Sequence, residues 1–254
     1  MGGHSVRHRT RPAPSHRPAM SGGRITLSVL GGFELRCGGH PVSVPLSAER
    51  LLAFAALQNR PVNRSFVAGT LWPETTDERA AANLRSALWR LRRLSPDLVE
   101  TSPERFRLGN GTAVDAHELT ASIWRILDPS EEPATGDILH VCAPSDLLPG
   151  WYEDWVLIER ERLRQLRLHA LETLCERLTA TRRFGLAVEA GLVAVQEEPL
   201  RESAQRALIR THLAEGNPAE AVRQYRRYHQ ALVEELGLEP SPEMVDLVRT
   251  ITVV

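Results

Sequence analysis

The sequence contains no lysine, so all 31 of its basic residues are arginine. The phosphate-binding loop of nucleotide triphosphatases needs a lysine, as do Schiff-base, biotinyl and lipoyl chemistry, and these classes are therefore excluded. The cationic side chain that remains is a planar guanidinium, which can bind phosphates and bases in a bidentate manner. Every cationic contact of this chain is therefore expected to be made by a guanidinium.

Cysteine and long apolar runs are also scarce. Cys37, Cys142 and Cys175 are odd in number and far apart, which excludes a disulfide framework and metal-ligand spacing. No stretch approaches the ~18 apolar residues of a membrane helix. Residues 1–23 hold four arginines, three histidines and three prolines without an apolar core, so they do not form a signal peptide. We expect a cytoplasmic protein with reduced thiols and no membrane contact.

Charge is divided unevenly along the chain. Residues up to Leu127 hold 17 arginines against 10 acidic residues, a net charge of +7, whereas the rest holds 14 against 22, a net charge of −8. These values add up to the overall −1. The asymmetry suggests a basic half that faces a polyanion and an acidic half with another task. Solvated arginine-rich surfaces are an equally good explanation until motifs are considered.

The order of predicted elements in the first half is that of a DNA-binding module. Residues 1–23 are polar and Pro-rich, and we interpret them as a disordered arm. Strands are expected at 25–30, 33–37 and 41–44, helices at 47–58, 65–72 and 76–94, and a hairpin at 98–101 and 105–108 with a short strand near Val114. Three helices followed by a hairpin, with leading strands, indicate a winged helix-turn-helix of the response-regulator type.

The second half is predicted to be helical and repetitive. One amphipathic helix covers 116–127, residues 128–150 are loop-like, and a long helix begins near Trp151. Ala187-Val188 aligns with Ala221-Val222 at an offset of 34 residues, the period of a tetratricopeptide repeat (TPR). We therefore divide the chain into the arm (1–23), a winged helix-turn-helix DNA-binding domain (24–115) and an all-α TPR-like domain (116–254). A generic helical bundle is the alternative for the last part.

The helix at 76–94 is strongly amphipathic. Ala81, Leu84, Leu88 and Leu91 share one face and should pack inward. The opposite face and its edges carry small, polar and cationic side chains, together with Ala82. The candidate DNA-contacting residues are Arg79, Asn83, Arg85, Ser86, Trp89, Arg90, Arg92 and Arg93.

These residue types match readout of the major groove. Arginine binds guanine O6 and N7, asparagine pairs with adenine, and small side chains permit close approach. Arg105 and Arg107 on the hairpin are expected to meet phosphates or a minor groove. A solvated basic face is the alternative, but the order of the elements favours DNA. Because one such module gives little discrimination, we expect a homodimer on double-stranded DNA.

Catalytic patterns are missing from the sequence. None of the nine histidines lies in an HExxH or HxE motif, and neither GxSxG nor GxGxxG occurs. The sequence therefore predicts neither an enzyme nor a bound metal or cofactor.

Four segments resemble the Streptomyces antibiotic regulatory protein family: RITLSVLGGFELRCGGHPVSV, SAERLLAFAAL, LWPETTDERAAANLRSALWRLRR and LLPGWYEDWVLIERERLRQLRLHALETL. The resemblance implies a mainly α fold, with a winged helix of the OmpR/PhoB type followed by a bacterial transcriptional activation domain. It also implies activators that bind promoter direct repeats, recruit RNA polymerase with its principal sigma factor, and often control antibiotic clusters.

Carried over by position, the resemblance places the recognition helix at 76–94 and the wing at 98–108. It implies that the turn formed by Pro73, Glu74 and Thr75 faces polymerase, and that the all-α domain contributes dimer contacts. The first hypothesis is thus a transcriptional activator. The second is an adaptor whose TPR-like domain binds a peptide or a small effector, with DNA binding secondary.

Overall fold

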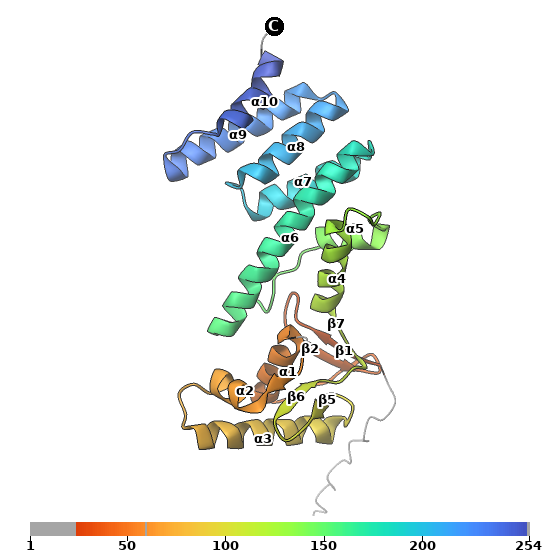
Figure 1. The fold of residues 1–254 in the computed structure, drawn as a ribbon, viewed down its shortest axis with the longest axis vertical. Helices are drawn as coiled ribbons and strands as arrows, with labels where there is room; N and C mark the ends of the chain where they lie inside the picture. The colour runs from red at the N-terminus through yellow and green to blue at the C-terminus, as the bar shows by residue number, and fades with distance from the viewer. Residues whose placement is uncertain (1–23, 59, 253–254) are drawn as a thin grey trace, which may run out of the picture.

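The computed structural model describes residues 24–58 and 60–252, so the predicted arm at 1–23 lies outside the described residues. The molecule is elongated, with the three-helix part at one end and the stacked helical pairs at the other (Figure 1). Helix α3 lies along the outer edge of the first end, far from α8 to α10. The mainly helical fold with a small β component is the predicted one.

The first half contains short strands around three helices, as predicted. The elements are β1 (Ile25–Ser28), β2 (Glu34–Cys37), β3 (His40–Pro41), α1 (Leu46–Gln58), β4 (Val62–Asn63), α2 (Arg64–Leu71), α3 (Asp77–Leu94), β5 (Val99–Thr101), β6 (Arg105–Leu108) and β7 (Thr112–Val114). Strand β4 was not predicted. It extends the β5–β6 hairpin into a sheet of order β4-β6-β5, which ties the start of α2 to the hairpin.

The strand near Val114 does not stay with the hairpin. As β7 it pairs in parallel with β1, through Ile25 with Thr112 and Leu27 with Val114, and completes a sheet of order β3-β2-β1-β7. The Asp115 carboxylate then accepts hydrogen bonds from the backbone amides of Val29 (2.9 Å) and Leu30 (3.2 Å). The chain therefore crosses back to the first sheet before the next helix begins.

The second half is helical, as predicted. Its elements are α4 (Asp115–Leu127), α5 (Thr135–Cys142), α6 (Asp154–Ala180), α7 (Phe184–Glu197), α8 (Glu202–Glu215), α9 (Pro218–Leu236) and α10 (Pro242–Thr252). The pairs α6–α7 and α8–α9 follow the predicted 34-residue offset, and the equivalent Leu174 and Leu208 are both fully buried. Gly216 turns the second pair with a left-handed φ of 90°. The division between residues 115 and 116 stays a prediction.

Two expectations for residues 128–153 were wrong. The predicted loop contains α5, whose Ile138 and Val141 are buried, and whose Asp137 accepts hydrogen bonds from Arg125 on α4. This short helix depends on those tertiary contacts, which its own sequence does not reveal. Helix α6 begins at Asp154 rather than near Trp151, because the Trp151 ring stacks on Phe33 at 6.2 Å in an extended segment before the helix.

Backbone contacts fix the two halves to each other. The Leu148 amide donates to the Val29 carbonyl and the Gly31 amide donates to the Asp146 carbonyl, both at 2.8 Å. Arg160 of α6 donates to the carbonyls of Leu147 and Leu148 and so holds this connecting segment in place. The residues that follow β1 are thereby held to the segment that precedes α6, and Arg160 holds that segment to α6 itself.

Gly191 of α7 lies where this helix packs closely against α6 and α8. An added Cβ would lie 3.0 Å from Leu208 and 3.2 Å from Cys175 Sγ. We expect Gly191→Ala to lower the free energy of unfolding by about 1–3 kcal/mol through overpacking. Gly185→Ala in the same helix meets nothing within 4 Å and should be neutral or stabilising. Urea unfolding of both variants checks this, and equal midpoints would contradict it.

Candidate nucleic-acid interface

Helix α3 buries one stripe and exposes the rest. Its buried residues are Ala80, Leu84, Ala87, Leu88 and Leu91. The prediction that Ala81 packs fully inward was wrong: Ala81 is half-buried, and Ala80 and Ala87 fill the stripe instead. The stripe follows positions i, i+4, i+7, i+8 and i+11, which holds the helix against α1 and α2.

All eight predicted contact residues of α3 are exposed on the side away from this stripe. They are Arg79, Asn83, Arg85, Ser86, Trp89, Arg90, Arg92 and Arg93. Trp89 is 60% exposed, which is unusual for so large an apolar side chain. These exposed side chains comprise five guanidiniums, an amide, a hydroxyl and one indole. The helix that carries them lies at the free edge of the molecule (Figure 1).

The guanidiniums of α3 are little used by the fold. Arg93 lies 5.2 Å from the centroid of the Trp89 ring, in cation–π geometry. Arg90 donates a long hydrogen bond of 3.4 Å to the Ser47 hydroxyl of α1. Within the described part of the chain, none of the α3 arginines pairs with a carboxylate. Their positive charge is therefore available to an external anion.

The two arginines of the β5–β6 hairpin differ in their surroundings. Arg105 is exposed, and its guanidinium has no partner among the described residues. Arg107 instead lies opposite Glu100 in the strand register and donates to Glu100 Oε2 from Nε at 2.8 Å and from Nη2 at 2.5 Å. These hydrogen bonds lower the pKa of Glu100 below its usual value. Arg107 is thus half-buried and already paired, whereas Arg105 is free.

Sequence reasoning missed a residue that joins α2 to the hairpin. Arg64, the first residue of α2, donates to the Ser102 carbonyl in the hairpin turn at 3.2 Å. Asn63 before it caps the helix by accepting from the Ser65 amide at 2.9 Å. The Asn-Arg-Ser pattern at a helix start was the available signal.

The turn between α2 and α3 is short and exposed. Pro73, Glu74 and Thr75 all face solvent. The amide and the hydroxyl of Thr75 donate to the Trp72 carbonyl at 3.2 and 3.1 Å, which closes the turn. No other described residue covers these three, so they are accessible to a partner.

Metal-binding clusters and membrane-spanning helices are both missing from the described residues. No group of three or more histidine, cysteine or acidic side chains in residues 24–58 and 60–252 could hold a metal ion. Over the same residues, no helix is both long enough and apolar enough to cross a membrane.

Comparison with known proteins finds similarity to bacterial regulators. Residues 138–252 match the family model described as bacterial transcriptional activator domain. The regulatory protein AfsR of Streptomyces coelicolor is 24% identical over 257 residues, with 97% of this chain and 26% of that protein covered. AfsR of Streptomyces griseus is 28% identical over 241 residues, with 88% and 24% covered. The chain thus spans about a quarter of the length of these relatives.

A solved structure has the same fold. EmbR of Mycobacterium tuberculosis, determined in complex with a low-affinity phosphopeptide, superposes with a TM-score of 0.73 and 22% sequence identity. The superposition covers 91% of this chain and 65% of that one.

Proposed function

We propose that this chain, which belongs to the Streptomyces antibiotic regulatory protein family of transcriptional regulators, is a sequence-specific DNA-binding activator. The observation that carries the proposal is the exposed arginine face of α3, with the unpaired Arg105 of the hairpin in the same DNA-binding half. We further propose that it acts in the cytoplasm, without an enzymatic activity of its own, and controls a secondary-metabolite (antibiotic) cluster.

The geometry of α3 suits the major groove. Its 18 residues make a helix about 27 Å long, and the groove is about 12 Å wide, enough to admit one helix. Arginine side chains on the outer face can reach guanine edges, and Asn83 can reach an adenine. Arg105 then serves as the phosphate contact of the wing, which fixes register without reading sequence.

Specificity requires a second copy. A single module of this size buries roughly 600–1,000 Å² of protein surface on DNA. Two copies side by side on direct repeats add their base contacts and gain by avidity. We propose that the helical half supplies the contacts between copies.

Activation requires a contact with polymerase. The turn of Pro73, Glu74 and Thr75 lies between α2 and α3, and all three residues are exposed. We propose that this turn meets RNA polymerase carrying its principal sigma factor once the α3 face is seated on DNA.

Fluorescence anisotropy of a random-sequence duplex at two salt concentrations tests DNA binding first. An activator should bind weakly, and the logarithm of affinity should fall linearly with the logarithm of salt concentration. Selection from a random oligonucleotide pool then gives the site, its spacing and its symmetry. An adaptor with a peptide or effector partner would show no salt-dependent binding, and that result would overturn the proposal.

Arg105→Ala should weaken binding by a similar factor on every duplex. If Arg105 contacts one phosphate, the salt slope should become shallower by about one. Arg226→Ala, which removes an exposed arginine from α9, should leave the slope unchanged. Titrations on the selected site and on a scrambled site at four salt concentrations measure this. A loss confined to the selected site would show that Arg105 reads bases instead.

A further inference from the structure

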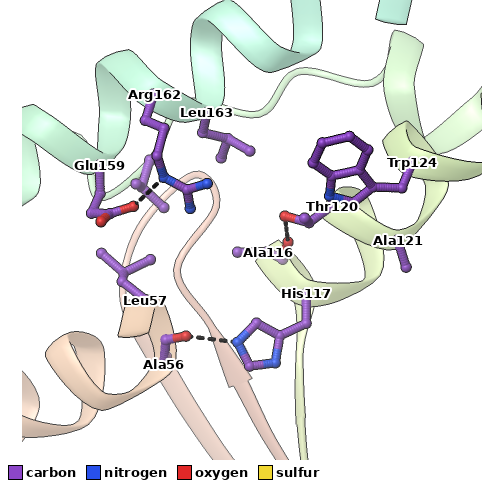
Figure 2. A pocket seen from close by; sticks show the side chains of 11 residues that line it. Ala56, Leu57, Ala116, His117, Thr120, Ala121, Trp124, Glu159, Arg162 and Leu163 are labelled. Carbon is purple, nitrogen blue, oxygen red and sulfur yellow. Dashed lines mark hydrogen bonds and ion pairs between the residues drawn. The ribbon is translucent and has the colours of Figure 1, made fainter. Parts of the chain in front are cut away.

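A pocket of about 330 Å³ lies where α1 of the DNA-binding half meets α4 and α6 of the helical half (Figure 2). Helix α1 contributes Leu57, α4 contributes Trp124, and α6 contributes Leu163, so most of the wall is apolar. The volume lies in the range of pockets that bind small molecules. We call it the α1–α4–α6 pocket.

One aromatic wall of the pocket is left uncovered by the fold. Trp124 is 58% exposed, whereas Ile123 and Ile126 of the same helix are fully buried. Figure 2 shows its indole ring on the side of the pocket opposite Arg162. An indole face in this position offers a stacking surface for a planar aromatic group.

Two polar side chains at the pocket have unused acceptors. His117 Nε2 lies 2.6 Å from the Ala56 carbonyl oxygen. Because a carbonyl only accepts, Nε2 carries the proton, and Nδ1 of the neutral ring is left as an acceptor. The Thr120 hydroxyl donates to the Ala116 carbonyl at 2.7 Å and keeps its lone pairs.

Arg162 supplies the unused donors. Its Nε donates to Glu159 Oε2 at 2.7 Å, which orients the guanidinium, and its two terminal nitrogens have no partner among the described residues. The outer edge of the guanidinium can therefore hold one carboxylate by two parallel hydrogen bonds. Because Glu159 already balances the charge of Arg162, a carboxylate is held here by the free N–H donors of the guanidinium, and a polyanion is disfavoured.

A neighbouring cavity of about 210 Å³ differs from the α1–α4–α6 pocket in how its arginines are bonded. It is lined by Arg160, Arg164 and Arg167, but these arginines are already engaged by the fold. Arg160 and Arg167 donate to backbone carbonyls, and Arg164 pairs with carboxylates. An anion there would have to displace existing bonds.

We propose that the α1–α4–α6 pocket binds a small molecule with a planar aromatic body and one carboxylate. The body lies between Trp124 and Leu163, and the carboxylate lies on the outer edge of Arg162. These three residues belong to the helical half, and Ala56 and Leu57 of α1 line the pocket from the other half. The proposal does not depend on DNA binding, because it is tested by ligand binding alone.

Calorimetric titration of the full chain with 2-naphthoate, and with the neutral 2-naphthamide, tests this pocket. We expect saturable binding of one naphthoate per chain. Arg162→Gln should weaken naphthoate binding about tenfold or more by removing a charge-assisted pair, and leave the weaker binding of the amide unchanged. Trp124→Ala should weaken both by about fivefold. Ala121→Phe, which fills the pocket from an exposed position, should abolish both.

Matched controls lie outside the pocket. Arg226→Gln on α9 and Tyr152→Ala, an exposed aromatic 79% accessible, should leave both affinities unchanged. Thermal unfolding of each variant checks that the fold is kept, and Arg162 and Trp124 are both 58% exposed, so little packing is lost. The proposal is overturned if no saturable naphthoate binding is found, if Arg162→Gln and Trp124→Ala leave it unchanged, or if the amide binds as tightly as the acid.

Discussion

A variant with Arg85 and Arg93 both replaced by alanine should lose thirtyfold or more in affinity for its selected DNA site. The two residues lie eight positions apart on the exposed face of α3, on either side of Trp89. Each bidentate contact with a base is worth about 1–3 kcal/mol of discrimination, so the pair is worth about 2–6 kcal/mol if both read bases. Since neither side chain pairs with a carboxylate in the described chain, the substitution should leave folding stability nearly unchanged.

The matched control removes the same charge from the other end of the molecule. Arg226 and Arg227 are exposed on α9, and neither has a partner among the described residues. A gel-shift titration at fixed salt should show little change for the Arg226→Ala, Arg227→Ala double variant. If both double variants lose affinity equally, the effect is one of net charge and the α3 face has no special role. Unchanged affinity of the Arg85→Ala, Arg93→Ala variant would show that these two residues do not contact the bases of the site.

Helix α3 could be predicted because its information is local. The apolar period, the acids in its first turn and the arginines in its last turn all agree with each other. The one error in the stripe, Ala81 in place of Ala80 and Ala87, has a physical cause. The alanine side chain is small enough to be either buried or exposed at the edge of the buried stripe. The packing of the neighbouring helices determines which alanines are covered.

Features that depend on distant partners, such as helix α5 and the pairing of strand β7, could not be predicted. Helix α5 is held by Arg125 of α4 through Asp137 and by Arg167 of α6, which donates to the Val141 carbonyl. Strand β7 has three residues, too few to specify β1 as its partner. In both cases the stabilising contacts lie more than ten residues away in the chain, and the local sequence carries no trace of them.

The candidate site also has features that the local sequence predicts and features that only the folded structure shows. Which side chains of α3 face outward follows from helix geometry, and their exposure agrees with it. Arg107 pairs with Glu100 because the register of β5 and β6 places these two residues opposite each other. The α1–α4–α6 pocket is harder still to predict from the sequence, because its walls come from three helices that are not consecutive in the chain.

The base of the hairpin depends on a glycine for a steric reason. The Gly109 amide donates to the Leu98 carbonyl at 2.9 Å, so the chain after β6 runs close beside the segment that leads into β5. A Cβ added at Gly109 would lie 1.8 Å from the Asp97 carbonyl oxygen. A backbone atom cannot rotate away as a side chain can, so the hairpin base must shift to admit any other residue.

Gly109→Ala should therefore lower the free energy of unfolding by about 3 kcal/mol, the upper end of the usual range for overpacking, because backbone has to move. It should also weaken DNA binding at every site, since the displaced hairpin carries Arg105 away from the phosphates. Gly111→Ala, two residues on, meets nothing within 4 Å and should match the parent in both measurements. Urea unfolding and anisotropy on one duplex distinguish the two variants. Should Gly109→Ala unfold at the same urea concentration as Gly111→Ala, the close approach of residues 97 and 109 does not hold the hairpin in place.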